Sequence, residues 1–285
     1  MSLFFTTPIV QVLLIPFLGT IVLIGLIRLI DRKSFGISTA NATVGAGFAW
    51  VCALILGTPN FPPAFNSGAI LSATVCLLGI GMALDLGLKD TTKFGRFIET
   101  TAFILSGIGI AAWMRGGIDF WAIPILLCWG VVVFGLQRVG TAREFGSGDG
   151  ALLLALASIG LGLIAWISDI AIDRDLAFGL SATSLGFLLW NLPKPRLFFG
   201  RSILLAGGGG LYMIALRLIE QAPPLLPSLI LVGFVFFADG AVRHFPQKFT
   251  MSGFLPPSMK LTILALIPLV LALLAAVIAT EFPVN

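Results

Sequence analysis

Long apolar segments constrain this 285-residue chain more than any other feature, because each is close to the length of a membrane span. A helix rises about 1.5 Å per residue, so about 20 apolar residues cross a hydrocarbon core roughly 30 Å thick. The segments lack the period-two alternation of outer-membrane barrel strands. Hydrophobic residues make up 58% of the chain and charged residues only 11%, whereas about 25% of a soluble domain is charged. The sequence therefore predicts an all-α, polytopic integral membrane protein.

Short connections rich in proline, glycine, asparagine or aspartate separate about ten expected transmembrane helices. None is long enough to fold by itself, so residues 1–285 are expected to form a single transmembrane domain. The first seven residues carry no basic side chain, and the apolar run after them is too long for a signal-peptide core, so no cleavable signal is expected. The expected spans lie near residues 8–30, 38–57, 68–88, 97–114, 119–137, 150–168, 176–192, 202–219, 227–242 and 261–280.

Basic residues alternate between the connections, and this alternation orients the chain. Fourteen of the 17 lysines and arginines fall in the odd-numbered connections, whereas the even-numbered ones hold only Arg115, Arg174 and Arg217. Cytoplasmic loops are enriched in Lys and Arg, so the odd-numbered connections are expected to face the cytoplasm and both termini the non-cytoplasmic side. The formal charge of +4 then reflects topology, and the expected partners are membrane lipids, not nucleic acid. The fourteen residues are Arg28, Arg32, Lys33, Lys89, Lys93, Arg96, Arg138, Arg143, Lys194, Arg196, Arg201, Arg243, Lys248 and Lys260.

The segment at residues 186–202, GFLLWNLPKPRLFFGRS, ends one expected span and begins the next. It resembles the polyprenyl-phosphate N-acetylhexosamine-1-phosphate transferases, a superfamily that includes the muramoyl-pentapeptide translocases. Members typically read G-F-L-x-x-N-x-x-P-A-x-[IV]-F-M-G-D-x-G-S at this point. The resemblance implies a multi-pass protein of the bacterial cytoplasmic membrane and chemistry that joins a sugar phosphate from a UDP-sugar to a lipid phosphate. With a one-residue tolerance at the prolines, the matching residues are Gly186, Phe187, Leu188, Asn191, Pro195, Phe198 and Gly200.

Shorter matches extend the resemblance along the chain. The sequence at 77–84 resembles the family's L-x-G-x-x-D-D span end, with Asp85 directly after it. A glycine-rich segment resembling D-G-x-D-G retains Asp149, and Asp239 stands where many members have an aspartate. Together with Asn191, these are the polar residues that still match the family. The three acidic ones and Glu99 lie near cytoplasmic ends of expected spans, where water and basic neighbours favour a structural role such as an ion pair.

Carboxylates that the family uses to bind Mg²⁺ are missing at three places. The resemblance implies a Mg²⁺ ion that bridges the pyrophosphate and neutralises developing charge. The family's Asp-Asp pair falls on Met82 and Ala83, and the aspartate after Phe-x-Gly falls on Arg201. The first aspartate of the D-G-x-D-G segment falls on Gly146, and the asparagine before it on Arg143. The chain is therefore expected to bind no metal cofactor and to be a degenerate, non-catalytic relative.

A cationic pocket is one hypothesis for what stands in place of the metal site. Arg201, Arg143, Lys194 and Arg196 lie in two connections expected at the cytoplasmic face. A guanidinium offers fixed donors to phosphate oxygens and supplies positive charge for binding, but not a metal's catalysis. These four residues are the candidate site for the headgroup of a polyprenyl phosphate or a phospholipid. The alternative is that they are ordinary basic residues solvated at the membrane interface.

Three functions stay open on these residues. The first is a pseudoenzyme that binds a lipid phosphate or a partner protein without catalysis. The second is a structural scaffold subunit of a larger membrane complex, with other membrane-protein subunits as partners. The third is an active glycosyl-1-phosphate transferase with an altered site. A channel or secondary transporter is disfavoured, because the sequence shows neither inverted repeats nor a charged residue in the middle of a span.

Overall fold

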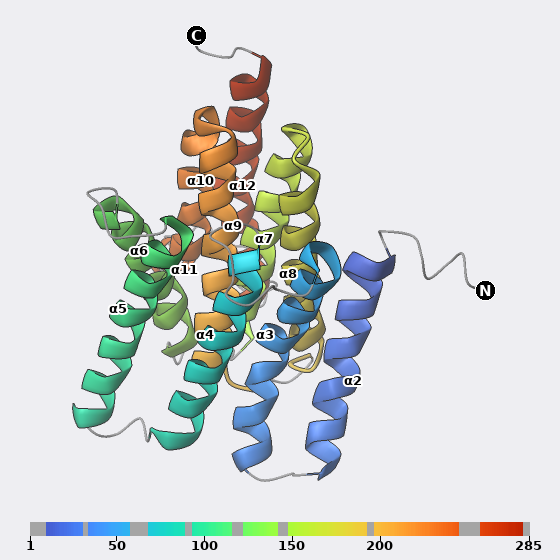
Figure 1. Cartoon of the computed structure of the whole chain (residues 1–285), viewed down its shortest axis with the longest axis vertical. Coiled ribbons are helices and arrows are strands. Elements are labelled where there is room, and N and C mark those ends of the chain that lie inside the picture. The colour runs from blue at the N-terminus through green and yellow to red at the C-terminus, as the bar shows by residue number, and fades with distance from the viewer. Residues whose placement is uncertain are drawn as a thin grey trace.

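The computed structural model is a bundle of helices, and the part of the chain that it describes contains no strand (Figure 1). The described residues are 10–30, 34–57, 68–88, 93–115, 122–141, 148–192, 197–244 and 257–281. The α-helices are α2 (Ile15–Ile30), α3 (Ser34–Leu56), α4 (Gly68–Gly87), α5 (Lys93–Arg115), α6 (Ala122–Thr141), α7 (Asp149–Ile167), α8 (Ala171–Leu189), α9 (Gly208–Gln221), α10 (Leu226–Gly233), α11 (Ala238–His244) and α12 (Pro257–Glu281). Two π-helical segments, η1 (Val10–Leu14) and η2 (Ile203–Gly207), precede α2 and α9, and two 3-10 segments, η3 (Pro223–Leu225) and η4 (Phe234–Phe237), flank α10.

Eight of these helical segments are long and apolar enough to cross a membrane, which confirms the all-α polytopic class. They coincide with eight of the expected spans. The other two, near 119–137 and 176–192, coincide with α6 and α8: the described apolar part of α6 is shorter (Leu126–Arg138), and α8 carries three charges at 173–175. In Figure 1, α2 begins and α12 ends toward the same upper side of the bundle. The count of ten spans and the outer position of both termini stay predictions.

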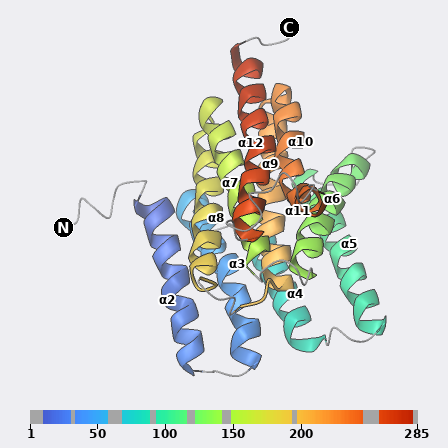
Figure 2. The same cartoon turned by 180° about the vertical axis from the view of Figure 1, so that it is seen from behind.

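Helix α9, with η2 before it, lies at the centre of the bundle (Figures 1 and 2). In the span Ile203–Gln221, 78% of an 18-residue stretch is buried, against 28% in Val10–Ile30 and in Ser258–Glu281. A β-carbon added at any of the four glycines at 207–210 would lie within 3.1 Å of a side chain of a different neighbour: α7, α6, α4 or α3. These glycines let four helices approach the backbone of α9 closely. A displacement of α9 would therefore disturb its packing against α3, α4, α6 and α7.

Candidate functional site

The resemblance segment lies at one end of the bundle, where its turn packs against two neighbouring helices. We call this the basic end: it comprises the helix ends joined by the connections that hold fourteen of the 17 lysines and arginines. The Asn191 side chain closes the turn, because its Oδ1 accepts a hydrogen bond from the Leu197 backbone N–H at 2.8 Å. The Phe199 ring packs on Gly150 at the start of α7, where an added β-carbon would lie 2.8 Å from the ring. The chain then enters the long helix of η2 and α9 at Arg201.

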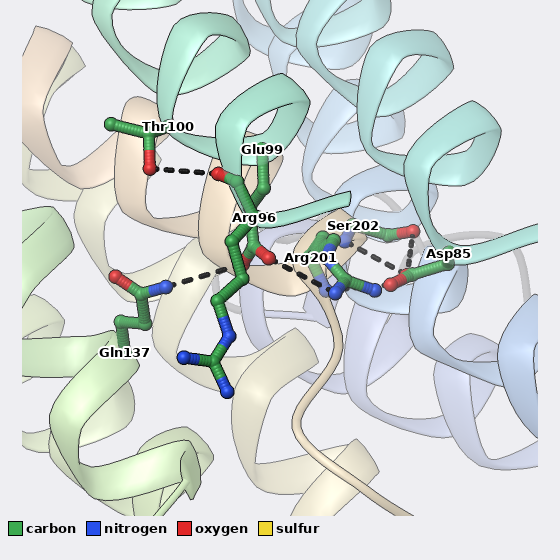
Figure 3. Close-up of polar contacts among 7 residues, drawn as sticks. All are labelled: Asp85, Arg96, Glu99, Thr100, Gln137, Arg201 and Ser202. Atoms are coloured by element: carbon green, nitrogen blue, oxygen red, sulfur yellow. Dashed lines mark hydrogen bonds and ion pairs between the residues drawn. The ribbon is translucent and has the colours of Figure 1, made fainter. Parts of the chain in front are cut away.

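Asp85, near the end of α4, caps the start of this helix (Figure 3). Its Oδ1 accepts a hydrogen bond from the Arg201 backbone N–H at 2.8 Å, and its Oδ2 accepts one from the Ser202 N–H at 3.0 Å. The Ser202 hydroxyl donates to the same Oδ2. The first N–H groups of a helix have no partner within the helix and carry partial positive charge, so a carboxylate from a neighbouring helix satisfies both requirements. Both Asp85 oxygens are thereby bound to the protein.

Two glycines allow this close approach. A β-carbon at Gly81 would lie 2.5 Å from the Ser202 Cα and 3.1 Å from the Arg201 carbonyl oxygen, so α4 meets the backbone of the incoming helix directly. A β-carbon at Gly200 would lie 2.8 Å from Asp85 Oδ2 and would collide with the Asn41 amide. Any larger residue at either position would push Asp85 away from the helix start.

The Arg201 side chain forms an ion pair with Glu99 of α5, with Nη2 3.0 Å from Oε2. Gln137 of α6 donates from its Nε2 to the other Glu99 oxygen at 3.2 Å. The pair is largely enclosed, with the Arg201 and Glu99 side chains 15% and 13% exposed. Figure 3 shows the chain of contacts that results, from Asp85 through Arg201 and Glu99 to Gln137. Four helices are thus joined through polar groups at the basic end: α4, α5, α6 and the helix that begins at Arg201.

A second ion pair lies at the same end. Arg138 of α6 reaches Asp239 of α11, with Nε 3.1 Å from Oδ2, and the Asp239 side chain is fully buried. A β-carbon at Gly240 would lie 3.2 Å from Arg138 Nη2, so the guanidinium runs along the α11 backbone. Asp149, in the first turn of α7, is also buried, with 4% of its surface exposed.

Four polar residues singled out in the sequence lie at the basic end. These are Asp85, Asp149, Asn191 and Asp239. Of the four candidate phosphate-binding residues, only Arg201 belongs to the described part of the chain, and Arg143, Lys194 and Arg196 lie outside the described residues. The four-residue phosphate pocket therefore stays a prediction. Arg201 itself is held by a carboxylate.

Sequence reasoning gave Glu99 a structural role but did not identify its partners, and it missed Gln137. One available signal was their depth. Glu99 stands near the start of one expected span and Gln137 at the end of the next, so antiparallel neighbours would bring them to the same level. A glutamate and a glutamine at the same level of adjacent apolar helices find partners in each other, because an unpaired polar group is costly there.

The chemistry of this arrangement is that of interhelical bonding. Among the described side chains, no group of three or more His, Cys, Asp or Glu residues could hold a metal ion. The oxygens of Asp85 and Glu99 are bound by N–H and O–H groups of the protein, so these carboxylates act as a helix cap and as the anion of an ion pair. The absence of a metal cofactor and of catalysis stays a prediction.

Comparison with known proteins supports a distant relation to the superfamily that the sequence resembles. The chain is 29% identical over 189 residues to a phospho-N-acetylmuramoyl-pentapeptide-transferase of Synechococcus sp. (strain JA-3-3Ab). The match covers 60% of this chain and 54% of the relative, so the chain spans about half of that protein's length. No family model matches the chain.

Proposed function

We propose that this chain is a non-catalytic membrane protein that binds a polyprenyl phosphate at its basic end, in a bacterial cytoplasmic membrane. The similarity to a phospho-N-acetylmuramoyl-pentapeptide-transferase supports the lipid class. The observation that supports the loss of catalysis is the engagement of Asp85 and Glu99, whose oxygens accept hydrogen bonds from Arg201 and Ser202 at the start of the η2–α9 helix and from Gln137. A carboxylate bound in this way has little capacity left for a metal, which prefers carboxylate oxygens of its own.

Charge supports binding of an anionic headgroup at this end. The basic end carries fourteen basic residues and seven acidic ones: Asp31, Asp85, Asp90, Glu99, Glu144, Asp149 and Asp239. Each Lys or Arg near a membrane surface contributes about 1 kcal/mol to attraction for anionic lipid. Within this excess, Glu99 fixes the direction of the Arg201 guanidinium. A guanidinium whose direction is fixed loses less entropy when it meets phosphate oxygens.

The loss of catalysis is tested by turnover. The purified protein in lipid nanodiscs is incubated with UDP-N-acetylglucosamine, undecaprenyl phosphate and Mg²⁺, and UMP release is measured. We expect no release above that of protein-free nanodiscs. Mg²⁺-dependent turnover that scales with protein concentration would overturn the proposal and establish an active transferase with an altered site.

The binding site is tested by removing the Arg201–Glu99 pair as a unit. The double variant Glu99→Gln/Arg201→Gln leaves the net charge unchanged, so a change in polyprenyl phosphate binding reports local geometry and not overall attraction. We expect Kd to rise about tenfold, the equivalent of about 1.4 kcal/mol. A matched control is Asp173→Asn/Arg217→Gln, which removes the corresponding pair at the other end of α9. Equal loss in both double variants, or no loss in either, contradicts a phosphate site at Arg201.

A further inference from the structure

A groove of about 270 Å³ runs between α4 and α5 and opens sideways from the bundle. Its floor is buried: Leu77 is 3% and Ile110 is 2% exposed, and both lie over Gly209 of α9. Its rim is exposed, with Ile80 at 40% and Leu105 at 60%. A groove with an apolar floor and an open apolar side is suited to one hydrocarbon chain entering from lipid.

The groove begins next to the polar cluster of the basic end and extends far from it. Ala102, at its near end, is three residues beyond Glu99 on α5, and Trp113, at its far end, is fourteen residues beyond. At about 1.5 Å per residue these positions lie roughly 4.5 Å and 21 Å from Glu99 along the helix. Half of a hydrocarbon core is about 15 Å. The α5 residues that line the groove thus extend over roughly 16 Å, a little more than the half-thickness of the hydrocarbon core.

The surface of α5 inside the groove also favours a branched, unsaturated chain. Ala102, Ser106 and Gly109 are small and recur about once per helical turn, which leaves recesses at a spacing similar to the length of one isoprene unit. Ser106 is 6% exposed, and its hydroxyl has no hydrogen-bond partner among the described residues. An isoprenoid double bond gives such a hydroxyl a weak π acceptor, and a saturated acyl chain gives it none.

Positive charge stands at the mouth of the groove nearest the basic end. Arg96, in the first turn of α5 and three residues before Glu99, is exposed there (Figure 3). This cation is complementary to a phosphate that ends the chain. We propose that the α4–α5 groove holds the isoprenoid chain of a polyprenyl phosphate whose phosphate lies at the basic end. This inference rests on the proposed function and assigns its lipid to one face of the protein.

Photo-cross-linking tests the groove directly. The probe is a polyprenyl phosphate with a diazirine in its chain, added to the full-length protein in phosphatidylcholine nanodiscs, and labelled peptides are identified by mass spectrometry. We expect labels on α4 and α5, and competition by unlabelled polyprenyl phosphate but not by an equal amount of phosphatidylglycerol. Gly109→Leu should lower this labelling about tenfold, because a β-carbon at Gly109 meets nothing within 4 Å and the added side chain enters the groove. Gly79→Leu is the control, since Gly79 has equally open surroundings on α4 and does not line the groove.

The outcomes separate the two proposals. If wild type binds the probe but Gly109→Leu binds it equally well, or if the labels fall outside α4 and α5, the groove is wrong and lipid-phosphate binding stands. If phosphatidylglycerol competes equally, the groove is a site for ordinary phospholipid and the isoprenoid assignment is wrong. If wild type does not bind the probe above phosphatidylcholine background, both proposals are wrong. Ser106→Ala adds a finer check: it should reduce the preference for the unsaturated probe over its fully hydrogenated analogue.

Discussion

The long helix of η2 and α9 carries an arginine near each end, Arg201 and Arg217, and each is paired with a carboxylate of a neighbouring helix, yet the two pairs are built differently. At the far end, Arg217 lies 2.9 Å from Asp173 of α8, and Gln221 donates to the other Asp173 oxygen at 2.7 Å. At the basic end, the pair of Arg201 and Glu99 is one part of a network that also includes a helix cap and a glutamine from a third helix. The Asp173–Arg217 pair joins two helices, α8 and α9, whereas the network at the basic end joins four.

The two pairs also differ in the charge of their surroundings. Outside the basic end, the chain has only three basic residues, Arg115, Arg174 and Arg217, against six acidic ones. The basic end has twice as many basic residues as acidic ones. An arginine that balances a carboxylate in acidic surroundings serves the fold alone. One that is oriented by a carboxylate within a basic surface serves the fold and can also contribute to attraction for an anion. The difference indicates where a ligand is to be sought.

Breaking the Asp173–Arg217 ion pair should have the largest effect on stability. Asp173→Ala leaves the Arg217 guanidinium, 13% exposed, without its carboxylate. Removing one partner of a buried pair costs about 3–5 kcal/mol. We expect this loss in the free energy of unfolding, measured by denaturation in detergent micelles, with polyprenyl phosphate binding to the folded fraction unchanged.

The double variant Asp173→Leu/Arg217→Met is the control for that prediction. Replacing both charges with apolar residues leaves no orphan group, so the double variant should be more stable than Asp173→Ala alone. A double variant that is no more stable than the single one would mean that the pair itself, and not the uncompensated arginine, determines the effect. Weaker polyprenyl phosphate binding in either variant would contradict the view that only the basic end contributes to lipid binding.

Removing the helix cap at the basic end should have the next largest effect. Asp85→Ala abolishes three hydrogen bonds to Arg201 and Ser202, at the start of the η2–α9 helix. Hydrogen bonds to a charged group contribute more than neutral ones and a lost N-cap costs about 1 kcal/mol, but water can reach this half-buried site. We expect a loss of about 2 kcal/mol, with Asp85→Asn intermediate because it keeps an acceptor oxygen. If Asp85→Ala and wild type had equal stability, the cap would have no energetic role.

The membrane helices could be predicted from the sequence because their signal is local. An apolar run of about 20 residues needs no knowledge of its neighbours to be identified. The prediction is weakest where tertiary contacts replace local apolarity, as in α8, whose first turn carries Asp173. The expected span near 176–192 left that aspartate in the connection before it, whereas the structure buries it completely against Arg217. The correction has a physical reason: a paired carboxylate can be buried where an isolated one cannot.

The site was harder to predict because its bonds join distant parts of the chain. Arg201 was recognised as the residue where the family has a metal-binding aspartate, but its partner Glu99 is 102 residues away. Asp85 was noted as a family-matching acidic residue beside a lost carboxylate pair, but not as a helix cap. Its role as a cap depends on two glycines: Gly81 lets the α4 backbone approach Arg201 and Ser202, and Gly200 leaves room for the Asp85 and Asn41 side chains. Resemblance located the region, whereas only three-dimensional packing assigned the bonds.

Gln137→Ala is the smallest of the expected effects and the sharpest test of whether the basic end is one network. The variant removes the hydrogen bond from Gln137 Nε2 to Glu99 Oε1, and should cost about 1 kcal/mol of unfolding free energy. Its informative quantity is coupling. In a double-mutant cycle with Glu99→Ala, the double variant should lose about 1 kcal/mol less unfolding free energy than the sum of the two single losses, because both variants remove the same bond. In a cycle with Asp173→Ala, at the other end of α9, the losses should add within about 0.5 kcal/mol. Additivity in the first cycle would mean that Gln137 supports the fold independently of Glu99. Coupling in the second cycle would mean that the helix from Arg201 to Gln221 transmits strain between its ends.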